Sequence, residues 1–531
     1  MTARLVDADT GTQVWAETFD RGGGEILTIQ DDIARSVVDV LRPRIGSIAA
    51  IAPPLSRTDN VDAYLAFLRG RALLARWTIG GSDAAEHEFS TAIALDPHFA
   101  AAYASLYDAR MLAEQRRSGG ASPGAGRPTL KPNTLDAARE KNSDLIERAL
   151  AIDPESGAAH FARAIWSDED FAARDRDFAA GLAHDPSNGR GITSYAEFLD
   201  HAGRADEAEQ MLARAIAIDP LSPRAYYWRV MRTFASDASK IERGMLGVLE
   251  IDPDYQPALQ RTAKYRWLHG EIAQAIRTIE HALSLDPTST WLAHTAVAMY
   301  LDIGDTTAAR AIVAASDRPE TAGQLLLDVR EGDVAAAGRA AFEDSAFANG
   351  ILETWGVFES VRDAALDSHA YDDAIAYIER RTNLGRNEGV IVENFHAVPP
   401  LAHVLLAAGR TEDARQLLRA CIQWIDDYHV PKLGNVYALR VKASSLLLLG
   451  ETDLALQTLD ASFRADDYAQ WWYTLERDPL WLPLHGDVRF EAIAGRVRAH
   501  IAEQRSTLAQ FRSQSLVPDR TAAAPSSVAS R

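Results

Sequence analysis

Hydrophobic residues recur at three- and four-residue spacing along most of the chain, in short blocks separated by polar turns. Residues 188–220 show the pattern once in full. Two apolar stripes predict two amphipathic helices there, and Gly203 stands in the turn between them, where a left-handed backbone costs a glycine little. The stripes are Ile192, Tyr195, Ala196 and Leu199, followed by Ala208, Leu212, Ala215 and Ile216.

The block returns at a fixed interval. A phrase that closes on Asp-Pro ends at Pro220, Pro253 and Pro287, at steps of 33 and 34 residues, and in related form at Pro97, Pro154 and Pro186. Proline disfavours helix in the residue before it and can open the next helix, so each phrase ends one block. Neither helix of a block can bury its stripe alone, and successive blocks must therefore stack. The pattern predicts an all-α solenoid.

The blocks resemble the tetratricopeptide repeat at three features: the turn glycine Gly203, the small residues Ala208 and Ala215 seven positions apart, and the closing Pro220. The resemblance implies a right-handed superhelical α-solenoid, which we expect to hold about ten helix pairs. It also implies that the first helices of successive pairs line a concave groove for a partner's peptide segment or helix. Leucine-rich repeats lack support because their strand signature is absent, and HEAT repeats prefer a longer period.

The first 52 residues follow a different pattern. Residues 2–8 and 12–19 alternate as two strands around Asp9-Thr10-Gly11, and residues 26–41 predict an amphipathic helix. This stretch resembles the end of the TolB-like domain that precedes such repeats in bacterial regulators linked to a nucleotide cyclase or a winged-helix domain. Two explanations remain open: the true start lies upstream, or a shortened hairpin packs on the first repeats.

The rest of the chain divides into three predicted parts. Residues 53–287 form the regular array, interrupted at 116–133 by a Gly/Pro/Ser-rich insertion, which we expect to be a flexible loop between the two helices of one pair, with a docking role as the alternative. Residues 288–505 hold diverged repeats and a closing segment that resembles the cap of the same regulator families. Residues 506–531 are polar and small, and we expect them to be disordered.

Charge and composition narrow the class of partner. A net charge of −20 argues against nonspecific binding to nucleic acid or anionic membranes. The single cysteine, Cys421, excludes internal disulfides, and its apolar neighbours predict a buried structural thiol. No apolar run is long enough to predict a membrane segment. We expect a cytoplasmic protein, or a periplasmic one if an upstream membrane segment is missing. Composition does not predict the oligomeric state.

Motifs for catalysis are absent from the sequence. It has no phosphate-binding loop, dinucleotide fingerprint, zinc motif or nucleophile elbow. His87 lies between Glu86 and Glu88, but adjacent helical residues do not face one another, so a solvated face explains them. We therefore predict no catalytic residues, no metal site and no cofactor. Trp471-Trp472-Tyr473 is interpreted as core of the cap, with a ligand-stacking platform as the alternative.

The repeat spacing then assigns the residues that face the groove. Aromatic and arginine side chains are the types that anchor interfaces, and several recur at these positions. The alternative is that several of the tryptophans pack between repeats. The predicted partner-binding residues are Arg163, Trp166, Arg190, Glu197, Asp200, Tyr226, Lys264, Trp267, Trp291 and His294.

Three functions are compatible with these features. The sequence favours a non-enzymatic scaffold that binds a protein or peptide. The second is the sensory or regulatory half of a bacterial cyclase or transcription regulator. The third is an enzyme, for which no residue pattern argues.

Overall fold

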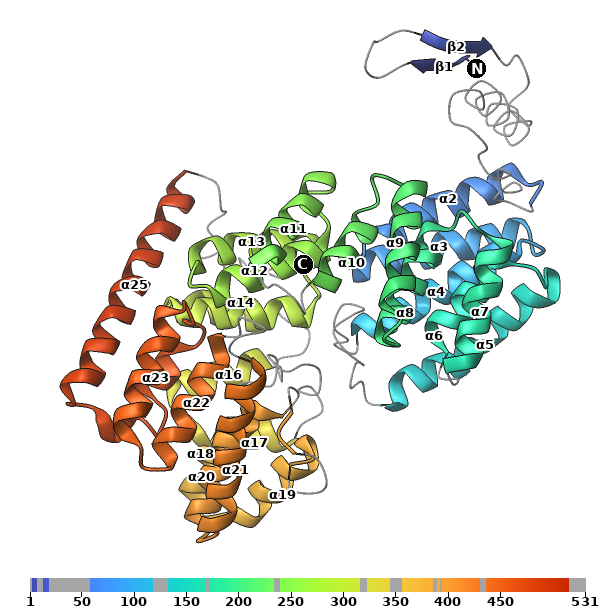
Figure 1. Cartoon of the computed structure of the whole chain (residues 1–531). Helices are drawn as coiled ribbons and strands as arrows, with labels where there is room; N and C mark the ends of the chain where they lie inside the picture. Colours follow the sequence, from blue (N-terminus) through green and yellow to red (C-terminus); the bar gives the residue numbers. More distant parts are fainter. Residues whose placement is uncertain are drawn as a thin grey trace, which may run out of the picture. The chain divides into compact units, whose positions relative to one another are not determined.

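The computed structural model describes residues 2–6, 13–18, 58–117, 132–167, 171–233, 239–315, 322–343, 356–384, 389–391, 394–429 and 436–514. Helices account for nearly all of this, and they follow one another two by two from α2 to α23 (Figure 1). The fold is an α-solenoid, as the apolar spacing predicted. The predicted helix at 26–41 lies outside the described residues.

The helices of the first half are bounded as follows: α2 Val61–Ala75, α3 Ile79–Leu95, α4 Ala100–Arg117, α5 Pro132–Ile152, α6 Gly157–Trp166, α7 Phe171–His184, α8 Gly189–His201, α9 Ala205–Ile218, α10 Pro223–Thr233 and α11 Ser239–Ile251. Next come α12 Gln256–Leu268, α13 Ile272–Leu285, α14 Thr290–Asp302, α15 Thr306–Ala314, α16 Ala322–Glu331 and α17 Val334–Glu343. The remaining elements are α18 Val357–Ser368, α19 Tyr371–Thr382, the 3-10 turn η2 Phe395–Ala397, α20 Val398–Ala407, α21 Thr411–Trp424, the π turn η3 Ile425–His429, α22 Val436–Leu448, α23 Thr452–Arg464, α24 Trp471–Glu476, the 3-10 turn η4 Leu482–Leu484 and α25 Val488–Ser513.

The block at 188–220 forms the predicted pair α8 and α9. Gly203 joins them with a φ of +77°, and its N–H donates to the carbonyl of Asp200. The predicted inner residues Ala208 and Ala215 are at most 1% exposed, so the two helices pack closely there. The same left-handed turn returns in the diverged region at Gly304, Gly332, Gly409 and Gly450. The hairpins therefore continue after the Asp-Pro phrase has faded.

The amino-terminal strands are β1 Thr2–Val6 and β2 Gln13–Thr18, which pair antiparallel with Thr2 opposite Thr18 and Leu5 opposite Trp15. The register shifts between Leu5 and Val6. This agrees with the predicted hairpin. The predicted insertion lies between α4 and α5, the two helices of one pair, and both helices extend a residue or two into it.

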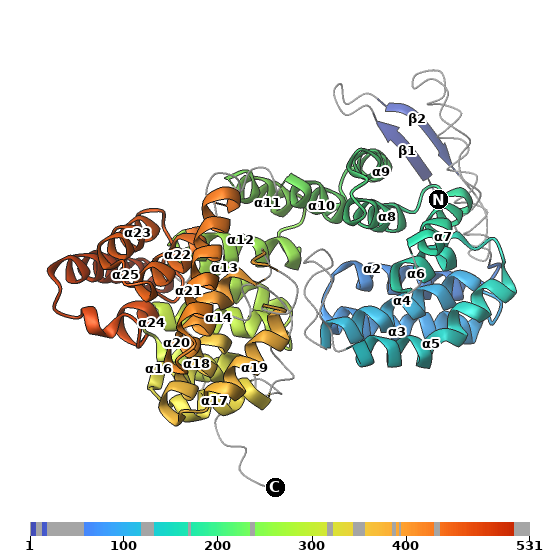
Figure 2. The same ribbon diagram turned by 60° about the horizontal axis from the view of Figure 1, so that its bottom comes forward.

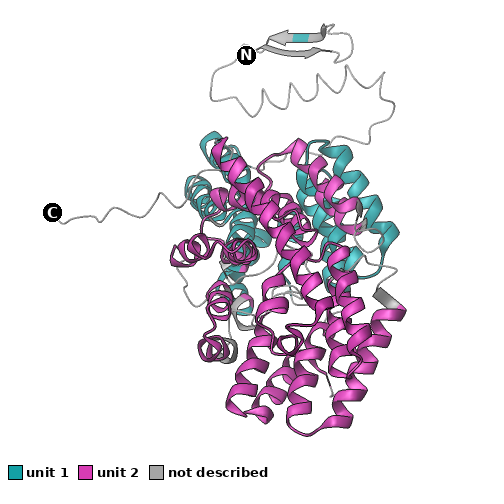
Figure 3. Cartoon of the chain, turned by 90° about the vertical axis from the view of Figure 1, so that its left-hand side faces the viewer, with its two compact units in different colours: residues 1–114, 136–225 teal, residues 115–135, 226–531 magenta. Residues whose placement is uncertain are grey.

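The chain divides into two compact units, coloured separately in Figure 3. Unit 1 holds residues 1–114 and 136–225, and unit 2 holds residues 115–135 and 226–531. The division falls within the stretch that we expected as one regular array, 53–287. Unit 2 contains a continuous apolar core that runs from α12 to α25.

Helix α25, the last described helix, packs back onto earlier helices of unit 2. Helix α25 lies against α23 (Figure 2) and also against α13, far earlier in the sequence. Gln504 accepts the N–H of Ala273 at 3.1 Å, and Leu508 is 2% exposed. Residues 506–513 thus form the last turns of a packed helix, and the prediction that disorder begins at 506 is wrong for them. The apolar positions Ile501 and Leu508, one side of the helix, explain why it continues.

Candidate partner-binding site

Two predicted groove residues of unit 1 donate hydrogen bonds to the same buried carboxylate. Asp108 of α4 accepts the indole N–H of Trp166 on α6 at 2.8 Å, and its other oxygen accepts Nε of Arg190 on α8 at 2.8 Å. These are the first helices of three successive pairs. The predicted repeat spacing therefore placed Trp166 and Arg190 on a common face. Asp108, which joins them, was missed; the available signal was a lone acid in the apolar stretch YASLYDARM.

Trp77 is the second residue that the sequence reasoning missed. It follows α2 in a left-handed conformation with φ of +62° and is 5% exposed. The guanidinium of Arg224 lies 4.7 Å from its ring centroid, and that of Arg190 lies 5.3 Å away. Such contacts between guanidinium and indole are attractive because the ring face carries negative charge. The repeat pattern assigned groove positions only on the first helices, so it gave no role to a residue in the turn after a helix.

The predicted residue Glu197 completes this set. Its carboxylate lies 3.8 Å from Arg224, which also donates to the Ser194 hydroxyl at 2.9 Å. Burial raises the pKa of Glu197 to about 7, and the positive charges of Arg224, Arg174 and Arg190 oppose that rise. We call Trp77, Asp108, Trp166, Arg190, Glu197 and Arg224 the unit 1 cluster.

The other two predicted residues of unit 1 are Arg163 and Asp200. Arg163 pairs with Asp177 of α7 through Nε at 2.6 Å, and its side chain is 41% exposed. Hydrogen bonds from His160 and Arg163 lower the pKa of Asp177 against the opposing effect of burial. Asp200 lies in the last turn of α8, next to the Gly203 turn.

In unit 2 the predicted residues fall into two environments. Lys264 of α12 places its ammonium 5.6 Å from the ring centroid of Trp291 on α14, and His294 lies one turn further along α14. All three side chains are partly exposed, as is Tyr226 on α10. The contact between Lys264 and Trp291 is chemically similar to the cation and indole contacts of the unit 1 cluster.

Trp267 is different, because the chain itself covers it. It is 7% exposed, and its indole N–H donates to the Asp302 carboxylate at 2.6 Å. The same carboxylate accepts the N–H of Gln470 at 3.0 Å, and the Asp302 carbonyl accepts the indole N–H of Trp471 at 2.8 Å. Trp267 therefore packs within the protein, which is the alternative that the sequence left open for the tryptophans. The segment that covers it could not be placed from the repeat spacing.

The terminal aromatic cluster is core, as predicted: Trp471, Trp472 and Tyr473 are at most 3% exposed. Cys421 is fully buried, and burial raises the pKa of its thiol to about 12. Among the residues that the structure describes, no group of three or more His, Cys, Asp or Glu could hold a metal ion. Every helix in the described part of the chain is too short or too polar to span a bilayer.

Comparison with protein families and with curated sequences gives two local matches. A family model for the tetratricopeptide repeat matches residues 176–231, which include α8 and α9. A protein of Rhizobium meliloti (strain 1021) named "Putative adenylate cyclase 3" is 29% identical over 106 residues, which are 20% of this chain and 18% of that protein. The chain thus matches less than a fifth of that relative's length.

Several solved structures are similar at low identity. The Cut9 and Hcn1 assembly of the APC/C is 12% identical, with 88% of this chain and 81% of that chain covered and a TM-score of 0.36. Yeast Tom70 is 12% identical, with 90% and 95% covered and a TM-score of 0.27. PilF of Pseudomonas aeruginosa is 19% identical, with 34% and 83% covered and a TM-score of 0.28. The tetratricopeptide-repeat model thus matches residues 176–231, and further helix pairs lie on either side of that stretch.

Proposed function

We propose that this protein is a non-enzymatic scaffold that binds a protein or peptide segment through the first-helix face of unit 1. The unit 1 cluster is the observation that carries the proposal. It brings together Trp77, from the turn after α2, Trp166 of α6, Arg190 of α8 and Arg224 of α10, with Asp108 of α4 and Glu197 of α8 among them. Trp77 is buried, whereas Trp166, Arg190 and Arg224 are partly exposed.

The chemistry of the cluster suits a peptide. Arg190 and Arg224 are paired with Asp108 and Glu197 at 2.7 and 3.8 Å, so the face carries no large excess of either charge. Indole rings supply contact area at a small entropic cost, and a planar guanidinium group is the type of side chain that can donate to carbonyl oxygens. A face of this kind favours an extended segment or a helix with mixed polar and apolar side chains.

The test is affinity capture followed by binding measurements on the captured partner. The double variant Trp166→Ala/Arg190→Ala removes two anchors, and we expect its affinity to fall roughly tenfold or more. Arg176→Ala is the matched control, because Arg176 is exposed on the second helix α7 of the same repeat pair as Trp166. Circular dichroism must show unchanged helix content. Equal affinity of the double variant and the control would refute this face as the binding site.

The experiment also includes a variant of Lys264 and Trp291, the partly exposed pair in unit 2. Lys264→Ala/Trp291→Ala leaves the unit 1 cluster intact and removes the second cation and indole contact. If this variant alone loses the partner, the binding face belongs to unit 2, and the proposal for unit 1 is wrong.

The second candidate is the regulatory half of a bacterial signalling protein with a cyclase or winged-helix output domain. The local likeness to "Putative adenylate cyclase 3" favours it, over 106 residues. The purified chain should then form no cyclic nucleotide by itself but change the rate of a cyclase catalytic domain from the same genome when mixed with it. An unchanged rate, together with a specific partner of another kind, would favour the general scaffold.

A further inference from the structure

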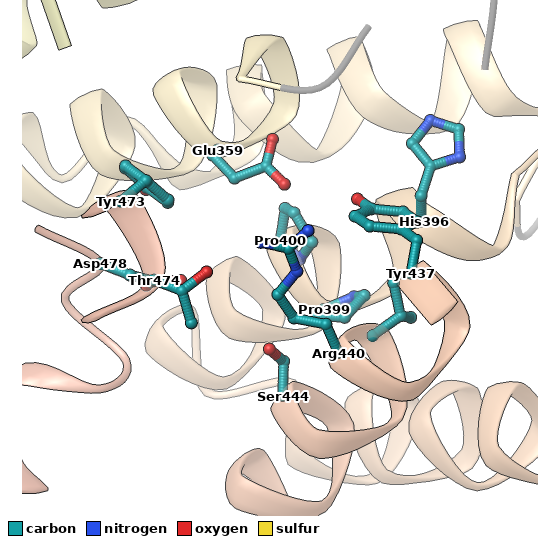
Figure 4. Close-up of a pocket in the computed structure, with 11 residues that line it drawn as sticks. Glu359, His396, Pro399, Pro400, Tyr437, Arg440, Ser444, Tyr473, Thr474 and Asp478 are labelled. Atoms are coloured by element: carbon teal, nitrogen blue, oxygen red, sulfur yellow. The ribbon is translucent and has the colours of Figure 1, made fainter. Parts of the chain in front are cut away.

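A small polar pocket opens inside unit 2, between the starts of α18 and α20, helix α22 and the segment around α24 (Figure 4). Its empty space is about 340 Å³, the mouth included. In Figure 4 the carboxylate of Glu359 and the hydroxyl groups of Tyr437 and Thr474 point toward the middle of this space. A polar pocket in the apolar core of unit 2 requires an explanation, because burying polar groups is costly unless they are paired.

Most charges around the pocket are already paired. Arg362 binds Asp478 at 2.9 Å and Asp363 at 2.8 Å. Arg440 binds Asp467 at 2.7 Å. These two arginines are 2% and 4% exposed, so both networks are cut off from water and held rigidly.

Glu359 is the exception. It is 9% exposed, and its Oε2 accepts the N–H of Gly356 at 2.9 Å, which caps the start of α18. It forms no ion pair with any described residue, although the carboxylates of Asp363, Asp467 and Asp478 each have one. The surroundings thus supply two cations for four acids, and a ligand with a positive charge would correct the imbalance.

A second group at the pocket, the guanidinium of Arg440, requires a hydrogen-bond acceptor instead of a cation. Arg440 lines the same pocket, and its buried Nε has no acceptor within the described protein. A buried guanidinium N–H without an acceptor costs free energy, and an oxygen of a ligand would satisfy it. Glu359 and Arg440 thus line one pocket, the first with a carboxylate that lacks an ion-pair partner and the second with an unsatisfied donor.

We propose that this pocket binds an α-ammonium group together with its neighbouring carbonyl or carboxylate oxygen, from a free amino acid or from the first residue of a peptide. The ammonium group lies against Glu359, and the oxygen accepts the N–H of Arg440. The hydroxyl groups of Tyr437, Ser444 and Thr474 offer the remaining hydrogen bonds. The proposal is independent of the unit 1 cluster, so either can fail without the other.

Protonation of Glu359 makes the site sensitive to pH. Burial raises the pKa of Glu359 to about 7, Arg362 and two backbone N–H groups oppose the rise, and Asp478 adds to it. The other titratable groups around Glu359 are Asp363, His396, His403, Tyr437, Arg440 and Tyr473. Burial lowers the pKa of both His396 and His403 to about 4, so neither supplies a positive charge at neutral pH. A ligand cation must therefore displace a proton from Glu359 in acid solution.

The experiment uses the full chain and ligand-observed saturation-transfer NMR. The probes are L-alanine, L-alaninamide and the peptide Ala-Gly-Gly, and N-acetyl-L-alaninamide is the matched probe that lacks the ammonium group. We expect saturation of L-alanine, L-alaninamide and Ala-Gly-Gly but not of N-acetyl-L-alaninamide. For L-alanine we expect affinity about eightfold higher at pH 7.5 than at pH 6, as Glu359 ionises. Tighter binding of Ala-Gly-Gly than of L-alanine identifies a peptide amino terminus as the source, and the reverse order identifies a free amino acid.

Glu359→Gln is the decisive variant, because glutamine can still accept the N–H of Gly356 and keep the cap of α18. We expect it to bind the probes at least tenfold more weakly. Glu412→Gln, a carboxylate of unit 2 with an 85% exposed side chain, is the control and should bind as the unaltered protein does. Equal saturation of the acetylated probe, no saturation of any probe, or unchanged binding by Glu359→Gln would overturn the assignment.

Discussion

At the scale of single residues, buried carboxyl groups set the electrostatics of both units. Glu197, Asp302 and Glu359 each have a pKa raised to about 7, and burial is the largest cause in every case. For Asp302, N–H groups of Gln470 and Trp267 oppose the rise. Because the native pKa of such a group lies above its unfolded value near 4, the native state holds the proton more tightly. Its contribution to stability is therefore present in acid and is lost as pH rises from about 4 to 7.

Glu359→Gln tests the direction of this pH dependence of stability, because it removes the titratable group and keeps the hydrogen bond to Gly356. We expect the free energy of unfolding of the variant, relative to the unaltered protein, to increase between pH 5 and pH 7. The limit is about 1.4 kcal/mol for each unit of pKa difference. Urea unfolding at a series of pH values measures it. A difference that decreases with pH would show that Glu359 is stabilised as the anion.

At the scale of helices, close packing depends on glycines around Phe161. An ideal Cβ on Gly191 of α8 would lie 2.4 Å from the Phe161 ring, and one on Gly181 of α7 would lie 2.8 Å from it. Real Cβ atoms do not approach that closely, so α7 and α8 reach the ring of α6 only without side chains at these positions. The sequence predicted the three helices, but it did not indicate which glycines served packing.

Gly191→Ala should therefore destabilise unit 1 by about 1–3 kcal/mol, the usual cost of overpacking a core. Gly189→Ala is a control on the same helix, because its Cβ would meet no atom within 4 Å. We expect the control to be neutral or slightly stabilising, since alanine has the higher helix propensity. Thermal unfolding followed by circular dichroism measures both. Equal effects of the two substitutions would contradict the packing argument.

At the scale of the whole molecule, unit 2 is closed by its own carboxyl end. Helix α25 buries Phe490, Ile493, Val497, Ile501 and Leu508 against α13 and α23. Each such side chain stabilises by about 1.5–3 kcal/mol when it leaves water. Together they amount to about 7.5–15 kcal/mol, which is as large as the stability of a typical domain. A solenoid also exposes an apolar face at its last repeat unless a terminal element covers it.

We expect a chain that ends at residue 486 to lose the cooperative unfolding of unit 2, while unit 1 still unfolds cooperatively. A chain that ends at residue 514 removes only the residues after α25 and should unfold like the full protein. Differential scanning calorimetry resolves the two cases. Full retention of the unit 2 transition in the shorter chain would mean that α25 is not required for its stability.

The sequence by itself determined the repeating helix pairs, their turns and the buried residues of α8 and α9, because these depend on spacing within one or two helices. The sequence also predicted that Trp166 and Arg190 lie on one face, because the repeat period brings corresponding positions of successive first helices to the same side. The tertiary structure alone decided what depends on contacts across many repeats: Trp77 against Arg224, Trp267 covered by Asp302 and the segment at Gln470, and the polar pocket at Glu359. Local spacing carries no information about which distant segment fills the space beside a helix, and that packing decides whether an aromatic side chain is core or free to bind.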